Sequence, residues 1–318
     1  MSCCFLSSAN SLFLILLMVG PIVSISSSNW IICWVGVEVS FLGLIPLLFM
    51  NNKYVSLTKE SAMKYFCIQA LGSALLLYSG LMTFSDLSSS FIMILLVLSV
   101  FIKLGVFPMH FWVPSVAAGL DWVPLFFTLT VQKIAPFAFL ILIISVFDSL
   151  FNMGIAILGG MTSLVGSLMG NNQTDLRAML GCSSIAHSGW LLLGCLTGYF
   201  WGYFFIYCLG LFFVFYFLSS SGSMSETGLG ILSLSGLPPF FMFLGKWGIL
   251  KSSIEGGFPA WLIGLFLLGA VISLGFYLKF SYSFLLNSNS LSWSGSSKHN
   301  LVMFLMVNFT ALLLFFFV

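Results

Sequence analysis

Apolar residues run along this chain in long stretches that short polar segments separate. A helix needs roughly 17–25 apolar residues to cross a bilayer. The pattern therefore predicts an all-α bundle of about eleven membrane-spanning helices, in a single domain over residues 1–318. We place the spans at 3–23, 29–50, 61–84, 90–118, 123–145, 150–169, 177–197, 199–219, 227–254, 259–286 and 300–318.

Two of these spans, 90–118 and 227–254, are overlong and contain prolines. Proline removes a backbone donor and clashes with the preceding turn, and in lipid the freed groups need neighbouring partners or a water-lined cavity. We therefore expect two broken helices. They are five spans apart, and an odd offset would invert a repeat, but the proline follows the lysine in one span and precedes it in the other. The prolines are Pro108 and Pro114 in the first span and Pro238 and Pro239 in the second.

Composition supports a membrane location. Of 318 residues, 60% are hydrophobic and 6% are charged, whereas a soluble domain carries about 25% charged residues. The loops are too short for a soluble domain or a nucleotide-binding fold, and the absence of a basic stretch argues against a nucleic-acid partner.

The cysteines form no C-x-x-C pair and no cluster that could hold an iron–sulfur centre, so we interpret them as small buried apolar residues. No group of residues suggests a metal site. The cysteines are Cys3, Cys4, Cys33, Cys67, Cys182, Cys195 and Cys208.

The first twenty residues lack a basic region and a cleavage site, which favours a retained span over a cleaved signal peptide. Basic residues gather in the loops on one side of the predicted bundle, and only Lys251 lies on the other. The positive-inside rule then places the N-terminus inside. The residues on that side are Lys53, Lys59, Lys64, Arg177 and Lys298.

Four charged residues fall inside predicted spans: Glu38, Lys103, Lys133 and Lys246. Each costs about 2.5–3.5 kcal/mol at a helix centre, and ionisable residues at this depth are functional candidates. A buried ion pair that only fixes helix packing could explain one glutamate and one lysine, but it leaves two lysines without an acidic partner.

Proton transfer is the chemistry that such residues permit. Burial makes a lysine lose its proton more easily, and a nearby carboxylate reverses this effect. A line of lysines with one glutamate at its head is a plausible relay if water fills the gaps. Lys103 lies five residues before Pro108 and Lys246 seven after Pro239, and transporters form ion sites at such breaks.

Three histidines occur. His187, in the middle of a span, is either a hydrogen-bonded core residue or a relay group that titrates near neutrality, and the sequence does not favour one over the other. His110 could line a cavity or anchor the turn after Pro108. His299 lies in a polar segment and is interpreted as solvated.

Several segments together resemble the chain 2 family of NADH-ubiquinone oxidoreductase. They occur in the family's order and run from the second predicted span to the ninth. The segments are W-V-G-V-E-V-S (34–40), K-Y-F-C-I-Q-A (64–70), K-L-G-V-F-P-M-H-F-W-V-P (103–114), Q-K-I-A-P (132–136), S-S-I-A-H-S-G-W (183–190) and L-S-L-S-G-L-P-P-F-F-M-F-L-G-K-W (232–247).

The resemblance implies an antiporter-like fold in the membrane arm of respiratory complex I, with eleven helices in the mitochondrial inner membrane and the N-terminus in the matrix. It implies that NADH, FMN, iron–sulfur clusters and ubiquinone belong to partner subunits, and that the partners are other membrane-arm subunits and lipids. The family's polar axis falls on Glu38, Lys103, Lys133, His187 and Lys246.

Three positions depart from the family's usual residues. Ser40 stands where Asn is more frequent, Ser115 where many members have Glu, and Gly245 where Pro usually precedes K-W. We expect the first two to alter hydration near Glu38 and Lys103, and the third to change the shape of the break near Lys246.

Two other functions fit the same residues. A stand-alone cation/proton antiporter shares this fold, and isolation in a very large complex would argue against it. A structural subunit, whose charges only orient helices, predicts that Lys133→Ala leaves proton pumping intact.

Overall fold

The computed structural model describes residues 8–49, 55–84, 90–146, 148–219, 224–286, 304–306 and 308. These residues form helices joined by short turns, without any strand in the described ranges. The chain divides into two compact units, Met1–Asn152 and Met153–Val318. Each unit is described by itself below.

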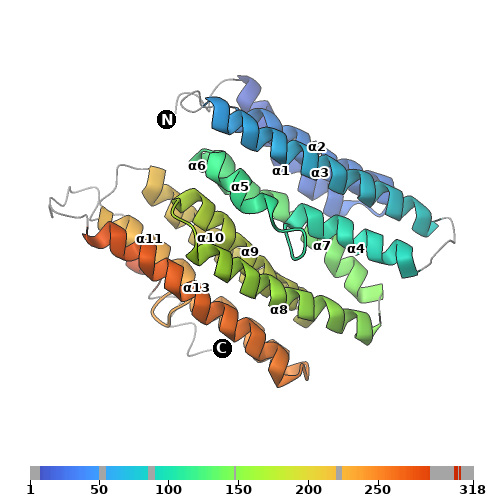
Figure 1. The fold of residues 1–318 in the computed structure, drawn as a ribbon. Coiled ribbons are helices and arrows are strands. Elements are labelled where there is room, and N and C mark those ends of the chain that lie inside the picture. Colours follow the sequence, from blue (N-terminus) through green and yellow to red (C-terminus); the bar gives the residue numbers. More distant parts are fainter. Residues whose placement is uncertain are drawn as a thin grey trace. The chain divides into compact units, whose positions relative to one another are not determined.

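The described residues of the first unit form seven helices before α8. Figure 1 shows them in blue to green. They are α1 (Ser8–Ser26), α2 (Trp30–Leu48), α3 (Val55–Phe84), α4 (Ser90–Leu104), α5 (Trp112–Gly119), α6 (Trp122–Leu129) and α7 (Val131–Val146). The second unit holds most of α8 (Ser149–Asn171), followed by α9 (Leu176–Thr197), α10 (Phe200–Ser219), α11 (Met224–Ser235), α12 (Met242–Glu255) and α13 (Ala260–Leu286).

Eight spans in the described ranges are long and apolar enough to cross a membrane. They include α6 and α7 as one span. The predicted spans 90–118 and 227–254 appear instead as the helix pairs α4/α5 and α11/α12, so the prediction of two broken helices is confirmed. The predicted last span, 300–318, lies outside the described residues except at 304–306 and 308.

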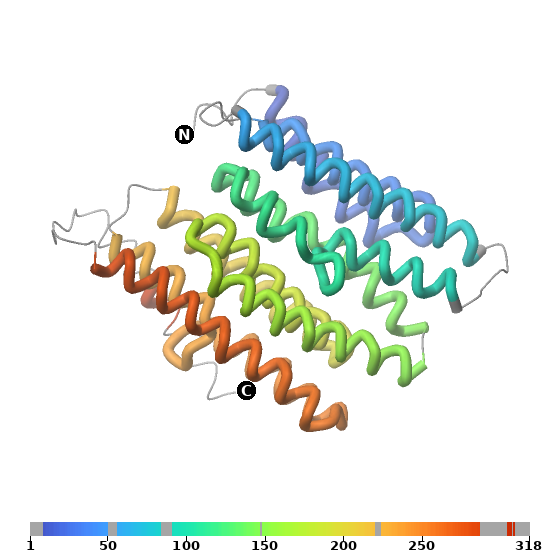
Figure 2. The backbone as a smooth tube through the Cα atoms, in the orientation of Figure 1, coloured from blue at the N-terminus to red at the C-terminus, as the bar shows by residue number. Residues whose placement is uncertain are grey.

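The break between α4 and α5 centres on Pro108, and Pro114 is not part of it. Pro114 lies in the first turn of α5, where a helix tolerates proline because the missing N–H would have no partner there. Figure 2 shows the segment between α4 and α5 as an excursion from the helical path.

Glycines let α1 and α2 pack with their backbones in contact. A Cβ added at Gly20 would lie 2.6 Å from the Gly36 carbonyl oxygen, and one added at Gly36 would lie 2.6 Å from the Ser24 nitrogen. Small residues allow such close helix packing in membranes, where there is little hydrophobic drive between helices. The α1–α2 pair is therefore a tightly packed part of the first unit.

The second unit uses the same device between α8 and α9. A Cβ at Gly166 would lie 2.6 Å from the Ala186 nitrogen, and one at Gly189 would lie 2.6 Å from the Gly159 carbonyl oxygen. The α9 span is 94% buried, and α10, α12 and α13 also contact it. This helix therefore forms the centre of the unit, and it carries His187.

Large apolar side chains lie exposed on the outer faces of both units, including Ile22, Phe205 and Val271. Exposed apolar residues are ordinary on any protein surface, but here they lie on spans that are themselves apolar. These faces suit contact with lipid.

Gly36→Ala should destabilise the protein, because its methyl group would overlap the α1 backbone, and overpacking of this kind costs about 1–3 kcal/mol. Gly154→Ala in α8 is the matched control, since a Cβ there meets nothing within 4 Å. We expect Gly36→Ala to lower the unfolding temperature of the detergent-solubilised protein and Gly154→Ala to leave it unchanged or raise it. Equal unfolding temperatures for the two variants would contradict the proposed α1–α2 packing.

Candidate functional site

The first helix break begins directly after Lys103. Gly105 has a φ of +67°, a left-handed conformation that glycine adopts without strain. The Gly105 N–H donates to the Ile102 carbonyl at 3.4 Å, and the Val106 N–H donates to the Phe101 carbonyl at 3.1 Å. This is the Schellman pattern that ends many helices, and it places Lys103 in the last turn of α4.

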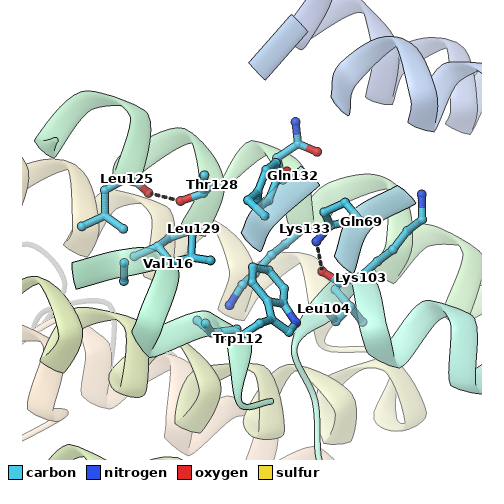
Figure 3. Close-up of a pocket in the computed structure, with 13 residues that line it drawn as sticks. Gln69, Lys103, Leu104, Trp112, Val116, Leu125, Thr128, Leu129, Gln132 and Lys133 are labelled. Carbon is cyan, nitrogen blue, oxygen red and sulfur yellow. Dashed lines mark hydrogen bonds between the residues drawn. The ribbon is translucent and has the colours of Figure 1, made fainter. Parts of the chain in front are cut away.

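Carbonyl groups freed at this break have side-chain partners. The Trp112 Nε1–H donates to the Ile102 carbonyl at 3.0 Å, and the Gln69 amide donates to the Lys103 carbonyl at 3.3 Å. Figure 3 shows the second bond. Because an unpartnered carbonyl is costly at membrane depth, Trp112 of α5 and Gln69 of α3 stabilise the break.

Lys103 is 7% exposed and interacts electrostatically with Glu38 of α2. No ion pair within 4 Å joins these two described side chains. The interaction is therefore a long-range one, which either group can change by altering its charge without breaking a direct bond.

A small cavity brings Lys103 together with Lys133, which is 5% exposed. Its volume is about 20 Å³, and a polar site needs roughly 10–15 Å³ to hold one water. Figure 3 shows the two lysine side chains pointing in different directions. The cavity is therefore large enough for one water molecule, although the Lys103 and Lys133 side chains do not point toward each other. Its other polar lining residues are Tyr65, Gln69, Thr128 and Gln132.

Lys133 follows an interruption that the sequence did not predict. Thr130, with a φ of −115° and a ψ of −78°, separates α6 from α7, although the predicted span 123–145 is continuous. The Gln132 side-chain amide, from the residue before Lys133, donates to the Ser40 carbonyl of α2 at 2.8 Å. Gln132 thus ties the start of α7 to α2, two residues beyond Glu38.

Two of the three residues that depart from the family's usual ones, Ser40 and Ser115, lie in the first unit. A Cβ at Gly20 would lie 2.6 Å from the Ser40 Cβ, so Ser40 sits at the close α1–α2 contact, where a larger side chain has little room. Ser115 is exposed on α5.

The second break places Lys246 against the end of α11. Gly236 has a φ of +78°, and the Lys246 Nζ donates to the Ser235 carbonyl at 2.7 Å. Lys246 is 7% exposed, and its Nζ lies 5.9 Å from the centroid of the Trp190 ring. The lysine therefore satisfies the last carbonyl of the first half-helix from its position on the second half.

The two breaks share a backbone pattern. Pro108 and Pro239 each lie three residues after the positive-φ glycine, and Phe111 and Phe241, which precede the second half-helices, have the same φ of −59° and ψ of −26°. Lys103 lies before its break, at the end of α4, whereas Lys246 lies after its break, in α12. This difference explains why the sequences around the two lysines match poorly.

Asn308 provides a partner for the second break. Its Oδ1 accepts from the Phe241 N–H at 3.1 Å, and its Nδ2 donates to the Phe304 carbonyl at 2.9 Å. Asn308 is buried. This role could not be predicted from the sequence, because the predicted last span, 300–318, was notable only for its hydrophobicity.

His187 is 3% exposed and has hydrogen bonds at both ring nitrogens. The Tyr203 hydroxyl lies 2.8 Å from Nδ1, and the Tyr277 hydroxyl lies 3.1 Å from Nε2. A third tyrosine, Tyr207, packs its ring centroid 5.0 Å from that of the imidazole. These tyrosines belong to α10 and α13, so no local motif around His187 could have revealed them.

Gly245 makes room for one of these tyrosines. A Cβ at this position would lie 2.9 Å from Tyr203 Cδ2. Gly245 replaces the proline that usually precedes K-W in the family, and the Tyr203 ring fills the space that a larger residue would need there.

The remaining candidates have simpler settings. His110 is buried, and its Nδ1 lies 3.1 Å from the Pro108 carbonyl, so it anchors the turn. His299 lies outside the described residues. Cys33, Cys182 and Cys195 are buried as predicted, but the prediction is wrong for Cys67, which lies on an exposed face of α3, and Cys208 is only half-buried. Cys3 and Cys4 are not among the described residues.

Each unit contains buried titratable side chains among its apolar residues. In the first, Lys103 and Lys133 line one small cavity, and Glu38 interacts electrostatically with Lys103. In the second, His187 bonds two tyrosines, and Lys246 lies near Trp190 of the helix that carries His187. Buried amines, a carboxylate and an imidazole bonded to hydroxyl groups can accept and release protons. Among the described residues, these groups form no arrangement typical of covalent catalysis.

Comparison with known proteins decides the family. Residues 27–228 match the model described as NADH:quinone oxidoreductase/Mrp antiporter, TM. The NADH-ubiquinone oxidoreductase chain 2 of Albinaria caerulea is 36% identical over 296 residues, which cover 93% of this chain and 94% of that protein. The chain belongs to the NADH-ubiquinone oxidoreductase chain 2 family. The resemblance seen in the motifs is thereby confirmed.

Solved structures support the antiporter-like fold of this chain 2 family member. A chain of respiratory complex I from Thermus thermophilus with bound aureothin aligns with a TM-score of 0.78 and 23% identity, over 93% of this chain and 77% of that chain. A chain of the Mrp complex from Dietzia sp. DQ12-45-1b aligns with a TM-score of 0.75 and 16% identity, over 84% and 59%.

Gly236→Ala should destabilise the second unit more than Gly257→Ala does. Both glycines have positive φ values, so both variants incur the left-handed strain of about 1–2 kcal/mol. A Cβ at Gly236 would also lie 2.9 Å from Lys246 Nζ, whereas one at Gly257 meets nothing within 4 Å. Displacing the amine leaves the Ser235 carbonyl unsatisfied, at a further cost of about 1–3 kcal/mol.

The difference is measured as the unfolding temperature of each variant in the same detergent. If the two variants unfold at the same temperature, Lys246 does not support the break.

Proposed function

We propose that this chain is a core membrane-arm subunit of the proton-pumping NADH:ubiquinone oxidoreductase, and that it moves protons through Glu38, Lys103, Lys133, His187 and Lys246. Quinone reduction elsewhere in the enzyme drives the change in electrostatics. The chain performs no chemistry on NADH itself.

Family membership supports the first part of this proposal. Relatives of similar length carry the name NADH-ubiquinone oxidoreductase chain 2, and they come from animals, which agrees with a multi-pass protein of the mitochondrial membrane. The structural neighbours are chains of multi-subunit membrane complexes. The partners of this chain are accordingly other subunits of the complex.

The observation that carries the second part is the burial of Lys103, Lys133 and Lys246 beside three helix interruptions. A lysine at this depth is costly unless it has a function or a partner. Each of the three lies where the helix ends or restarts, so polar backbone groups are available nearby.

Glu38 is proposed to control the first lysine. When its carboxylate is charged, Lys103 is held in the ammonium form, and when it is neutralised or moves away, desolvation favours release of the proton. The water-sized cavity that both Lys103 and Lys133 line supports transfer from one lysine to the other.

The second unit is proposed to continue the path through His187 to Lys246. The family match at residues 27–228 spans the boundary between the units, which supports their acting as one antiporter-like domain.

We further propose that the N-terminus faces the matrix, as the basic residues Lys59, Lys64 and Arg177 at the starts of α3 and α9 suggest. NADH, FMN, iron–sulfur clusters and ubiquinone are assigned to partner subunits. Membrane lipids are assigned to the exposed apolar faces.

A stand-alone cation/proton antiporter is the second candidate, since the Mrp chain shares the fold. A native-gel separation of solubilised membranes distinguishes the two. We expect mass spectrometry to find this chain in a very large assembly that oxidises NADH. Migration alone, or in a small complex, would favour the antiporter, and ion flux in proteoliposomes would then test it.

Glu38→Gln should lower pumping-coupled turnover while leaving assembly intact, because the amide keeps the size of the side chain but removes its charge. Glu60→Gln is the matched control, since Glu60 forms an exposed ion pair with Lys64 on α3 and such pairs contribute little. The measurements are NADH oxidation rate and protons translocated per NADH in proteoliposomes. An unchanged rate and an unchanged proton yield in Glu38→Gln would refute the role of this carboxylate.

A further inference from the structure

The hydrogen bonds of His187 impose opposite roles on its two tyrosine partners. A neutral imidazole has one N–H donor and one acceptor nitrogen. With Tyr203 at Nδ1 and Tyr277 at Nε2, one hydroxyl must accept while the other donates. Reversing the tautomer reverses both hydroxyls, so the three groups can change state together.

The two tyrosines lead away from His187 toward different neighbours. The Tyr203 ring packs against Gly245, the residue before Lys246. Trp190, three residues after His187 on α9, lies 5.9 Å from the Lys246 Nζ. The Tyr203 ring therefore lies against α12, the half-helix that carries Lys246.

Tyr277 belongs to α13, where it lies four residues from two buried serines. Ser273 and Ser281 precede and follow it by one helical turn, so all three share one face of the helix. Tyr277 therefore lies on a buried face of α13 that carries other hydroxyl groups.

We propose that Tyr203 and Tyr277 carry protons to and from His187, and that the three side chains form a proton wire from α13 through α9 to α10. This rests on the proposed function, and it adds two proton-carrying residues to the five already assigned.

One transfer can be written for the tautomer with its proton on Nδ1. A hydronium ion gives a proton to the Tyr277 oxygen, and Tyr277 gives its own hydroxyl proton to Nε2. Nδ1 gives its proton to the Tyr203 oxygen, and Tyr203 releases its hydroxyl proton to a water molecule. One proton enters and one leaves, no net charge stays on the three side chains, and no phenolate forms if the shifts are concerted.

After this transfer, the imidazole carries its proton on Nε2 and cannot pass a second proton in the same direction. It must first return to its original tautomer, which requires the hydrogen bonds to the phenols to break and re-form. The wire therefore passes one proton per reset.

The test compares Tyr203→Phe, Tyr277→Phe and Tyr207→Phe in the assembled complex. Each substitution removes one hydroxyl and keeps the ring. Tyr207 is the control, because its ring packs on the imidazole while both ring nitrogens are bonded to the other two tyrosines. Rates of coupled NADH oxidation and protons translocated per NADH are measured in proteoliposomes, with assembly checked on native gels.

We expect Tyr203→Phe and Tyr277→Phe each to lower coupled turnover on the order of 10²-fold, the lower end of what a positioned proton-transfer group contributes, and Tyr207→Phe to stay close to the unsubstituted protein. Equal losses in all three variants would indicate a packing role and overturn the wire. A loss at only one of the two wire tyrosines, or at neither, would overturn it as well.

His187→Gln separates this proposal from the one on which it rests. If His187→Gln lowers coupled turnover but neither Tyr203→Phe nor Tyr277→Phe does, only the wire is wrong. If His187→Gln has no effect, His187 has no part in the path and the proposed function itself must be revised. Loss of assembly in a Phe variant is addressed by Tyr→His at the same position, which restores a proton-carrying group and should recover turnover if the wire is correct.

Discussion

The structure depends on one requirement: at membrane depth, every backbone group freed by a helix break needs a partner. Trp112 and Gln69 provide partners at the first break, and Lys246 and Asn308 provide them at the second. Residues that close the breaks therefore come from the second half-helix itself or from a different span. Lys103, Lys133 and Lys246 lie at or near helix interruptions, where polar backbone atoms are already present, whereas Glu38 and His187 lie within continuous helices.

The two units solve this requirement with one backbone design and two placements of the lysine. A positive-φ glycine, a proline three residues later and a phenylalanine with the same dihedral angles recur in both. In the first unit the lysine ends the helix before the break, and in the second it lies on the helix after it. The common backbone supports a repeated origin for the units, whereas the different placements suit a path in which successive cations play different parts.

Sequence reasoning predicted the all-α bundle, both broken helices and the burial of Lys103, Lys133 and Lys246, because hydropathy reports the depth of a residue in the membrane. It did not predict the interruption at Thr130, where neither glycine nor proline marks the turn. It also missed the partners. Tyr203 and Tyr277 reach His187 across 16 and 90 residues of sequence, and Asn308 reaches Phe241 across 67. Hydropathy carries no information on which helix faces which, and so these contacts required the folded chain.

The bond between Lys246 and the Ser235 carbonyl would allow one side chain both to exchange a proton and to satisfy the end of a helix. An ammonium group has three N–H donors, and the neutral amine that remains after one proton leaves still has two. The bond to the carbonyl can thus persist in both charge states, while the attraction to the Trp190 ring depends on the positive charge. Loss of a proton from Lys246 would weaken its attraction to the Trp190 ring but would keep its hydrogen bond to the end of α11. The helix end would then stay the same in both charge states, and only the contact with the ring would depend on whether the amine is protonated.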